Sequence, residues 1–456
     1  MIGSSTVSKT LAVMSLLVGG RAAAQGPEGE PPSAGVPDVL TLSWAVDAAL
    51  VHYPAMGAAR AGVESALAGG RGARSAWWPS LTVGGNVTHF QFPMLVRPLH
   101  ELDASQIIFD NDPIQGQVFA DWLVFDGGER RARIRRADAA AEGADAGLEA
   151  TEMSVIEGTV GTYLQVRTLR EILGAQEAQV RALDAERERA QLLLQAGRAP
   201  RVELLRAEAA LSQAQAELAS ISAMLRASED QLARLVGIQG GEVSDRELSE
   251  VRPGGRPEAS GVPPMPPTDS LHPVLRQSWS QVLEAGAVHS ETKASWFPDL
   301  GLSAGARQYG APGVDFANEW QVGVSLSYPL FTGFRRTNQI EAAEAQLGVA
   351  RERHRLRQFE VAQELDEASA ALQEANARVT ALEGAVEQFT EVARIEALAL
   401  QAGAGVQRDF LDAQAALFQN QAGLAQARNG RVLALVRQAA ALGVLDPSWL
   451  LQNLES

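Results

Sequence analysis

Two aspartates near the C-terminus have the residue type and spacing best suited to act on a passing solute. Asp409 and Asp412 are three residues apart and follow the glycines Gly403 and Gly405. In a helix this spacing places both carboxylates on one face. Acidic groups in the first turns of a helix also stabilise it through the helix dipole. Taken alone, the residues favour this structural role, and a role toward a ligand needs further support.

The remaining polar residues form no catalytic constellation. The sequence has no cysteine, which excludes disulfides, thiolate chemistry and an acylated N-terminal cysteine. The glycine-rich stretch 69–72 lies in a helix-like segment and does not follow a strand, as a phosphate-binding loop would. No two histidines have the helical spacing of a metal-ligand pair; they are His52, His89, His100, His272, His289 and His354. We therefore expect no enzyme, cofactor or metal site.

Composition points to long helices. The 456 residues carry a formal net charge of -16, and only 5% of them are aromatic. The acidic balance argues against a nucleic-acid partner, which requires a basic surface. Alanine, glutamine, glutamate, arginine and leucine dominate, as in coiled coils.

The N-terminus resembles a secretory signal peptide. Residues 1–24 contain Lys9, a short apolar stretch and three alanines that suit a cleavage site. Residues 25–39 are rich in proline and glycine and are expected to form a flexible lead-in. No other segment is apolar over about 18 residues. We therefore expect an exported chain without a transmembrane helix.

The sequence contains two copies of one pattern. The segment 123–134 resembles 329–340, and Ala196-Gly197 matches Ala402-Gly403, both 206 positions apart. Upstream, Trp78-Pro79 matches Phe297-Pro298 at an offset of 219. The 13-residue difference predicts an insertion in the first copy, where residues 94–113 would form a long loop. The predicted organisation is a first repeat, a linker, a second repeat and a tail, at 40–250, 251–267, 268–445 and 446–456.

Each repeat contains a long helical hairpin. Residues 128–195 and 334–401 lack proline and predict helices of roughly 100 Å. Heptad spacing of leucine and alanine predicts close helix packing, which a filamentous dimer would also show. The glycine breaks near 197 and 403 instead turn each helix back on a shorter partner. The predicted hairpins are 128–237 and 334–443.

Four segments have the two-residue period of strands. Apolar residues alternate with small or polar residues in 80–92, 115–125, 299–309 and 319–331. One strand of this kind fits a small soluble sheet, but four in an exported chain are typical of outer-membrane strands. Trp320 and Tyr328, near the ends of the last strand, and Trp122 are the candidate aromatics at the membrane interface.

Four strands are too few to close a barrel, and open sheet edges are not tolerated in lipid. Two chains would supply eight strands, whose interior is filled by side chains, whereas three would supply twelve and leave a lumen. The smallest assembly that makes a pore is therefore a trimer.

With these repeats, hairpins and strands, the sequence resembles the TolC-like outer membrane efflux protein family. The resemblance lies in the opening Leu40-Thr41-Leu42 with Pro54, the strand entry Trp78-Pro79, Phe125-Asp-Gly-Gly128 and the helix break with Glu203-Leu204-Leu205. Each motif is weak alone, but their order, present twice over about 40–445, is specific.

The resemblance implies a fold that is mainly α with a small β part. Two long antiparallel hairpins per chain would build a periplasmic tunnel, and four strands would join a trimeric twelve-stranded β-barrel in the outer membrane. It also implies a periplasmic adaptor and an inner-membrane pump as partners. The expected function is a passive export conduit in a tripartite efflux or type I secretion system.

The resemblance also assigns roles to the tips. Some family members carry two aspartates at the positions of Asp409 and Asp412, lining the periplasmic constriction, and in a trimer these would form two rings that favour cations. In the first repeat, Glu203 and Arg206 stand at the corresponding positions and are expected to form a local ion pair. The hairpin turns are the expected adaptor contacts, and Pro200 departs from the family pattern; the residues are Gly197, Arg198, Pro200, Gly403 and Gly405.

Two other classes remain open. A periplasmic adaptor would have one hairpin and flanking β domains, and a structural coiled-coil envelope protein would lack strand pairs with an apolar outer face. The duplicated hairpins and strand pairs favour the channel.

Overall fold

The computed structural model describes residues 36–98, 107–254 and 272–455. The predicted signal peptide, all but the end of the lead-in and most of the 251–267 linker lie outside these ranges. Residues from Val39 onward form one compact unit.

The two repeats have parallel element orders. The first contains α1 (Leu42–His52), α2 (Pro54–Ser75), β2 (Ser80–Val87), β5 (Ile114–Phe125), α3 (Glu129–Gln195) and α4 (Arg201–Val236). The second contains α6 (Pro273–Ala294), β8 (Asp299–Ala311), β9 (Val314–Ser327), α7 (Arg335–Gln401) and α8 (Gln407–Ala441). The predicted mainly α fold with two long hairpins is confirmed.

The long helices α3 and α7 have 67 residues each, and the residue before each helix has a left-handed backbone conformation. Both end one residue before a turn in which Gly197 (φ 70°) and Gly403 (φ 74°) reverse the chain. Glycine adopts this conformation without the steric cost that a Cβ atom brings. At the start of α7 the same region is occupied by Phe334 (φ 64°), where the first repeat has Gly128.

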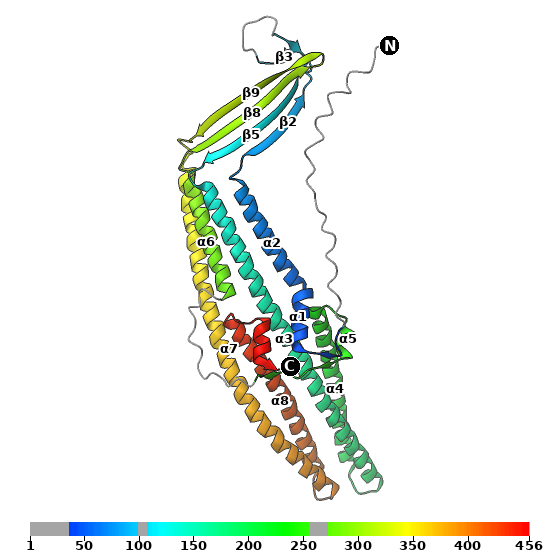
Figure 1. Cartoon of the computed structure of the whole chain (residues 1–456). Helices are drawn as coiled ribbons and strands as arrows, with labels where there is room; N and C mark the ends of the chain where they lie inside the picture. The colour runs from blue at the N-terminus through cyan, green and yellow to red at the C-terminus, as the bar shows by residue number, and fades with distance from the viewer. Residues whose placement is uncertain (1–35, 99–106, 255–271, 456) are drawn as a thin grey trace, which may run out of the picture. The chain divides into compact units, whose positions relative to one another are not determined.

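Small and aliphatic side chains hold the hairpins together. Leu211 and Ala214 of α4 pack on Leu183 of α3, and Leu411 of α8 joins this cluster. A second cluster farther from the turns joins Ile172 of α3 to Ala425 of α8. Helix α3 therefore contacts both hairpin partners, and Figure 1 shows the two hairpins side by side with their turns at the same end.

The sheet joins the two repeats. Its order is β2-β5-β8-β9, and all neighbours are antiparallel. It lies at the end of the helical region opposite the hairpin turns (Figure 1). Strand β2 ends at Val87 and β9 at Ser327, earlier than the predicted 92 and 331, and β9 begins at 314, earlier than the predicted 319. Pro329 has no N–H to extend the β9 ladder.

Several short elements complete the fold. The predicted long loop contains a small hairpin of β3 (Met94–Leu95) and β4 (Phe109–Asp110). The predicted tail contains α9 (Pro447–Asn453), which Asp446 caps by accepting from the Trp449 N–H, followed by β10 (Leu454–Glu455). The other short elements are β1 (Val39–Leu40), α5 (Gly240–Ser244), β6 (Glu247–Leu248) and β7 (Arg252–Pro253).

These short elements bring distant segments together. Strand β1 pairs with β6, and β10 pairs with β7 at the start of the linker. The buried Tyr163 hydroxyl of α3 donates to the Leu40 carbonyl (2.7 Å), which fixes the β1 end of the chain to the long helix. Within the described ranges, no helix is both long and apolar enough to cross a membrane.

Candidate functional site: an apolar sheet face and two hairpin tips

Strand register places apolar residues from all four strands on one face of the sheet. One row across the sheet reads Val83, Val118, Ala306 and Trp320. The next row on this face reads Leu81, Ala120, Ala304 and Val322. Rows on the opposite face contain Gln117, Arg307 and Glu319, or Asp121 and Ser303. Alternation along each strand therefore gives the sheet an apolar face and a polar face.

The apolar face is exposed in the single chain. Trp320, Val322 and Leu326 keep 79%, 70% and 71% of their surface accessible. A contiguous exposed face of this kind marks a site of contact with lipid or with another protein.

The three candidate interface aromatics lie at different levels. Trp320 is not at the end of its strand, because the turn at Gly313 lets β9 begin at Val314. It is instead the first residue of the apolar run, since Asn318 precedes it on the same face. Trp122 donates its indole N–H to the Trp77 carbonyl (3.0 Å) at the end of α2. Tyr328 follows β9, close to the guanidinium of Arg336.

A buried ion pair fixes the junction between sheet and helix in the first repeat. Asp126 and Arg130 are buried, with the Arg130 Nε 2.8 Å from the Asp126 carboxylate. The guanidinium also stacks on Trp77, 4.4 Å from the ring centroid. Burial raises the pKa of Asp126, but hydrogen bonds from the Arg130 and Gly128 N–H groups and from the guanidinium outweigh it and hold the pKa below its usual value. The negative charge therefore persists at the junction.

The second repeat has half of this arrangement. Arg336 occupies the position of Arg130 and lies near Trp296, but Thr332 replaces the aspartate. Arg336 is only 6% exposed, and its Nη2 has no hydrogen-bond partner. Sequence reasoning missed both arginines, although their matching positions in the duplicated segments were a visible signal.

The turn residues predicted to contact an adaptor lie at the exposed tips of the two hairpins. Gly197, Arg198 and Pro200 are exposed between α3 and α4, and Gly403 is exposed between α7 and α8. Gly405 is needed for a close approach, because an added Cβ would lie 2.8 Å from the Leu400 nitrogen. The turns therefore present backbone together with the exposed side chains of Arg198, Arg201 and Val406.

Asp409 and Asp412 lie in the first turns of α8 and are exposed. Asp412 pairs with Arg408 (Oδ2 to Nε, 3.6 Å), and both side chains are about three-quarters exposed. An exposed pair of this type contributes little to stability. In the first repeat, Glu203 and Arg206 stand at the corresponding positions. Within residues 107–254, which the structure describes, these two side chains do not form the ion pair that their spacing predicted.

A buried polar cluster above the tips was also missed. Glu186 of α3 accepts a hydrogen bond from the Gln407 amide of α8 (3.0 Å) and pairs with Arg189 (3.2 Å). Arg189 in turn donates to the Leu400 carbonyl of α7 (2.9 Å). These bonds join the two hairpins. Nothing in the sequence distinguishes Glu186 from the exposed glutamates around it, since its burial comes from the second hairpin.

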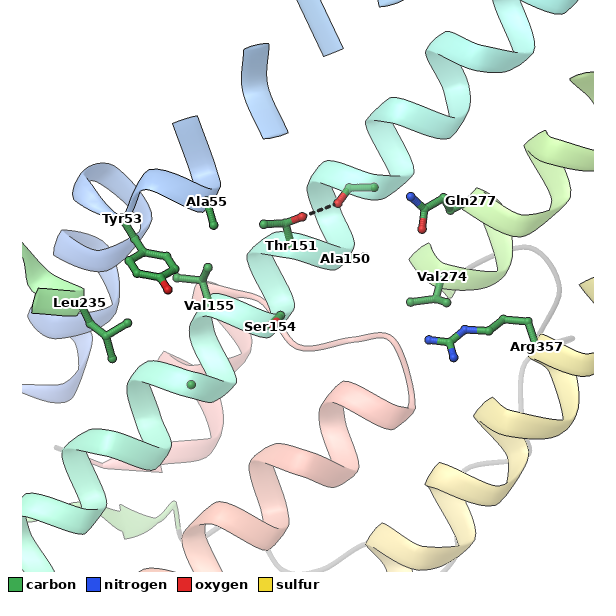
Figure 2. Close-up of a pocket in the computed structure, with 12 residues that line it drawn as sticks. Tyr53, Ala55, Ala150, Thr151, Ser154, Val155, Leu235, Val274, Gln277 and Arg357 are labelled. Atoms are coloured by element: carbon green, nitrogen blue, oxygen red, sulfur yellow. Dashed lines mark hydrogen bonds between the residues drawn. The ribbon is translucent and has the colours of Figure 1, made fainter. Parts of the chain in front are cut away.

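A hollow lies on α3, where it faces α6 and the loop between α1 and α2 (Figure 2). Its volume is about 710 Å³, and its wall contains no histidine, aspartate or glutamate; the polar side chains are Tyr53, Thr151, Ser154, Gln277 and Arg357. The Thr151 hydroxyl is bonded to the Gly147 carbonyl of its own helix (2.8 Å).

Together, the duplicated hairpins and the apolar sheet define an envelope protein with a membrane-facing β region. The family model described as outer membrane efflux protein matches residues 45–238 and 270–444. The chain belongs to the outer membrane efflux protein family, which assigns it to the outer membrane and to efflux.

Relatives and solved structures agree. The chain is 24% identical to nodulation protein T of Rhizobium leguminosarum bv. trifolii over 68% of both chains. It is 26% identical to the outer membrane efflux protein BepC of Brucella suis over 57% of this chain and 56% of that one. The fold matches the outer membrane protein VceC of Vibrio cholerae with a TM-score of 0.75 at 19% identity, covering 88% of this chain and 96% of that chain. The Campylobacter jejuni CmeC outer membrane channel gives 0.76 at 14% identity, over 90% and 88%.

Proposed function

We propose that three copies of this chain form the outer-membrane channel of a tripartite efflux or type I secretion system. The sheet with one apolar face and two free edges is the observation that carries this proposal. Such a sheet cannot stand open in lipid, whereas three of them supply the twelve strands of a barrel with a lumen. The hairpins would continue the lumen into the periplasm.

Transport through this channel would be passive. The chain would receive substrate through a periplasmic adaptor from an inner-membrane pump, and the pump would supply the energy. The exposed turns at Gly197–Arg201 and Gly403–Val406 are the proposed adaptor contacts. A relative such as the fusaric acid resistance protein FusA of Burkholderia cepacia, 29% identical over 42% of this chain and 37% of that one, is consistent with small-molecule efflux.

The aspartates at the tip would form the constriction. Three copies of Asp409 and Asp412 would make two carboxylate rings, whose field attracts cations and opposes anions. Trp122, Tyr328 and Trp320 would lie at the membrane interfaces, where amphipathic rings are favoured.

The decisive experiment is extraction and reconstitution. The purified protein in detergent should have the mass of three chains by light scattering and should form channels in planar bilayers. A monomeric mass together with the absence of conductance would refute the proposal.

Adaptor docking has a separate test. Exchange of the two turn segments for a Gly-Ser sequence should abolish export in cells while leaving the trimer and its bilayer conductance intact. Full export by the exchanged protein would remove the turns as docking elements.

A further inference from the structure

The two repeats are related by a fixed correspondence that the sheet obeys. Strand β2 pairs Leu81 with Ala120 of β5. Adding 219 to the first number and 206 to the second gives Leu300 and Leu326, which are paired in β8 and β9. The offsets found in the sequence therefore describe equivalent backbone positions. The contacts between the first and second repeats of one chain can thus be used to predict the contacts between the second repeat and the first repeat of another copy.

Within the chain, the repeats meet through β5 and β8 and through α3, which packs on both α6 and α8. At the junction, Phe297 packs on Gly127, where an added Cβ would lie 2.5 Å from the Phe297 Cβ. The equivalents of this pair are Trp78 and Gly333. Trp78 is 77% exposed, and no atom lies within 4 Å of a Cβ built on Gly333. The chain thus carries an uncovered side chain at one edge of the sheet and an uncovered glycine at the opposite edge.

The helices next to these edges have complementary side-chain sizes. Between α3 and α6, Gly143 receives Ser280, whose Oγ lies only 2.5 Å from the place that a Cβ added to Gly143 would occupy. The equivalent positions are Val349 on α7 and Ala61 on α2, both exposed. In this second pair the larger side chain, Val349, is on α7 and the smaller one, Ala61, is on α2. Val349 would therefore fit against Ala61 of another copy.

We propose that a second copy of this chain docks by repeating the contact between the two repeats, with a defined strand register. Val324 of β9 would lie opposite Val87 of the partner subunit, and Tyr328 would lie opposite Val83 of the partner subunit. Trp78 of the partner subunit would cover Gly333. This inference rests on the proposed trimer and adds the residues and the register of its interface, which continues the β5–β8 pairing around the ring.

The free guanidinium nitrogen of Arg336 fits this register. In the first repeat, Nη2 of Arg130 donates to the Val124 carbonyl (2.8 Å), in a segment that β8 holds extended. The equivalent carbonyl belongs to Leu330, which lies beyond the end of β9. A partner strand would extend the segment after Ser327 and bring that carbonyl to the position its counterpart occupies.

Disulfide trapping tests the register, because the natural sequence has no cysteine. The double variant V324C/V87C, oxidised with copper–phenanthroline in detergent, should give dimers and trimers on denaturing gels. The two positions lie on opposite edges of one four-stranded sheet, at least about 14 Å apart across the strands and several residues out of register along them, so a disulfide within one chain is excluded.

The matched control is V324C/V83C, whose second cysteine lies on the same strand and face but about 13 Å away. It should cross-link at least tenfold less than V324C/V87C, and neither single variant should give disulfide-linked trimers on denaturing gels. If V324C/V83C cross-links instead, or neither does, in protein whose mass is that of a trimer, the register is wrong while the proposed channel stands. A monomeric mass without cross-links overturns both.

Discussion

At the residue scale, the junction of sheet and helix contains the most constrained polar contact. The Asp126 carboxylate is buried against Arg130 and accepts two backbone N–H groups as well. Its counterpart in the second repeat, Thr332, makes no such contact with Arg336. This difference offers a paired experiment on the cost of an isolated buried guanidinium.

Replacing Asp126 with alanine should destabilise the protein by about 3 to 5 kcal/mol, because a buried charge loses its partner. Thr332→Ala, at the equivalent position, should cost less than about 1 kcal/mol. Denaturant unfolding of the two purified variants measures the difference. Equal losses would mean that the ion pair does not hold the junction.

The same pair has a pH dependence. Folding lowers the pKa of Asp126, so its contribution is complete above about pH 4, the usual unfolded value, and is lost as the pH falls through the lowered folded value. The stability difference between the parent and Asp126→Ala should therefore shrink in acid. A difference that grows with acidity would contradict this assignment.

Asp409 and Asp412 give a prediction about permeation. Replacing both with alanine should weaken cation selectivity and block by multivalent cations, because the carboxylate rings are removed. Arg408→Ala should act in the opposite direction, since it removes the positive charge that pairs with Asp412. Reversal potentials in planar bilayers measure both; unchanged selectivity in the double variant would exclude a constriction role.

At the scale of elements, the two hairpins are joined near their tips by few polar contacts. Glu186 holds Gln407 of α8, and its partner Arg189 holds the Leu400 carbonyl of α7. Opening of the tip by rotation of one hairpin against the other would have to break these bonds.

Glu186→Ala should therefore favour the open tip and raise single-channel conductance by a factor of about two or more, an equilibrium shift of roughly 0.4 kcal/mol. Glu188→Ala, two residues along α3 and largely exposed, is the control and should leave conductance unchanged. Equal conductance of both variants would show that the contact does not restrain the tip.

At the scale of the whole molecule, the sheet decides how the protein meets the membrane. Val322 lies on the apolar face, and its neighbour Gln321 lies on the polar face. Val322→Arg should cost about 2 to 4 kcal/mol in lipid if the apolar face contacts hydrocarbon. Gln321→Arg should be tolerated, because its side chain would enter the aqueous interior.

Heat-modifiability and folding yield in lipid vesicles measure this pair, with detergent-solubilised protein as reference. Equal folding of the two variants would contradict the proposal that the Val322 face contacts lipid and the Gln321 face contacts water. The matched positions are adjacent on one strand, so differences in backbone propensity are small.

How much could be predicted depends on the range of each interaction. Hairpins and strands are local patterns: heptads placed Leu211 in the helical interface, and alternation placed Val322 and Trp320 on one face. Strand ends were less well predicted. Strand β9 begins at Val314, because the turn at Gly313 reverses the chain there, and it ends at Ser327, shortly before Pro329, which has no backbone N–H to donate to a neighbouring strand.

The sequence by itself determined the helical and strand periods, the glycine turns and the duplication, since each depends on residues close in the chain or on equality of two segments. Only the tertiary structure decided that β5 pairs with β8 and that Glu186 meets Gln407. These contacts join positions far apart in the chain, and burial there is set by packing of whole elements, which no local pattern encodes.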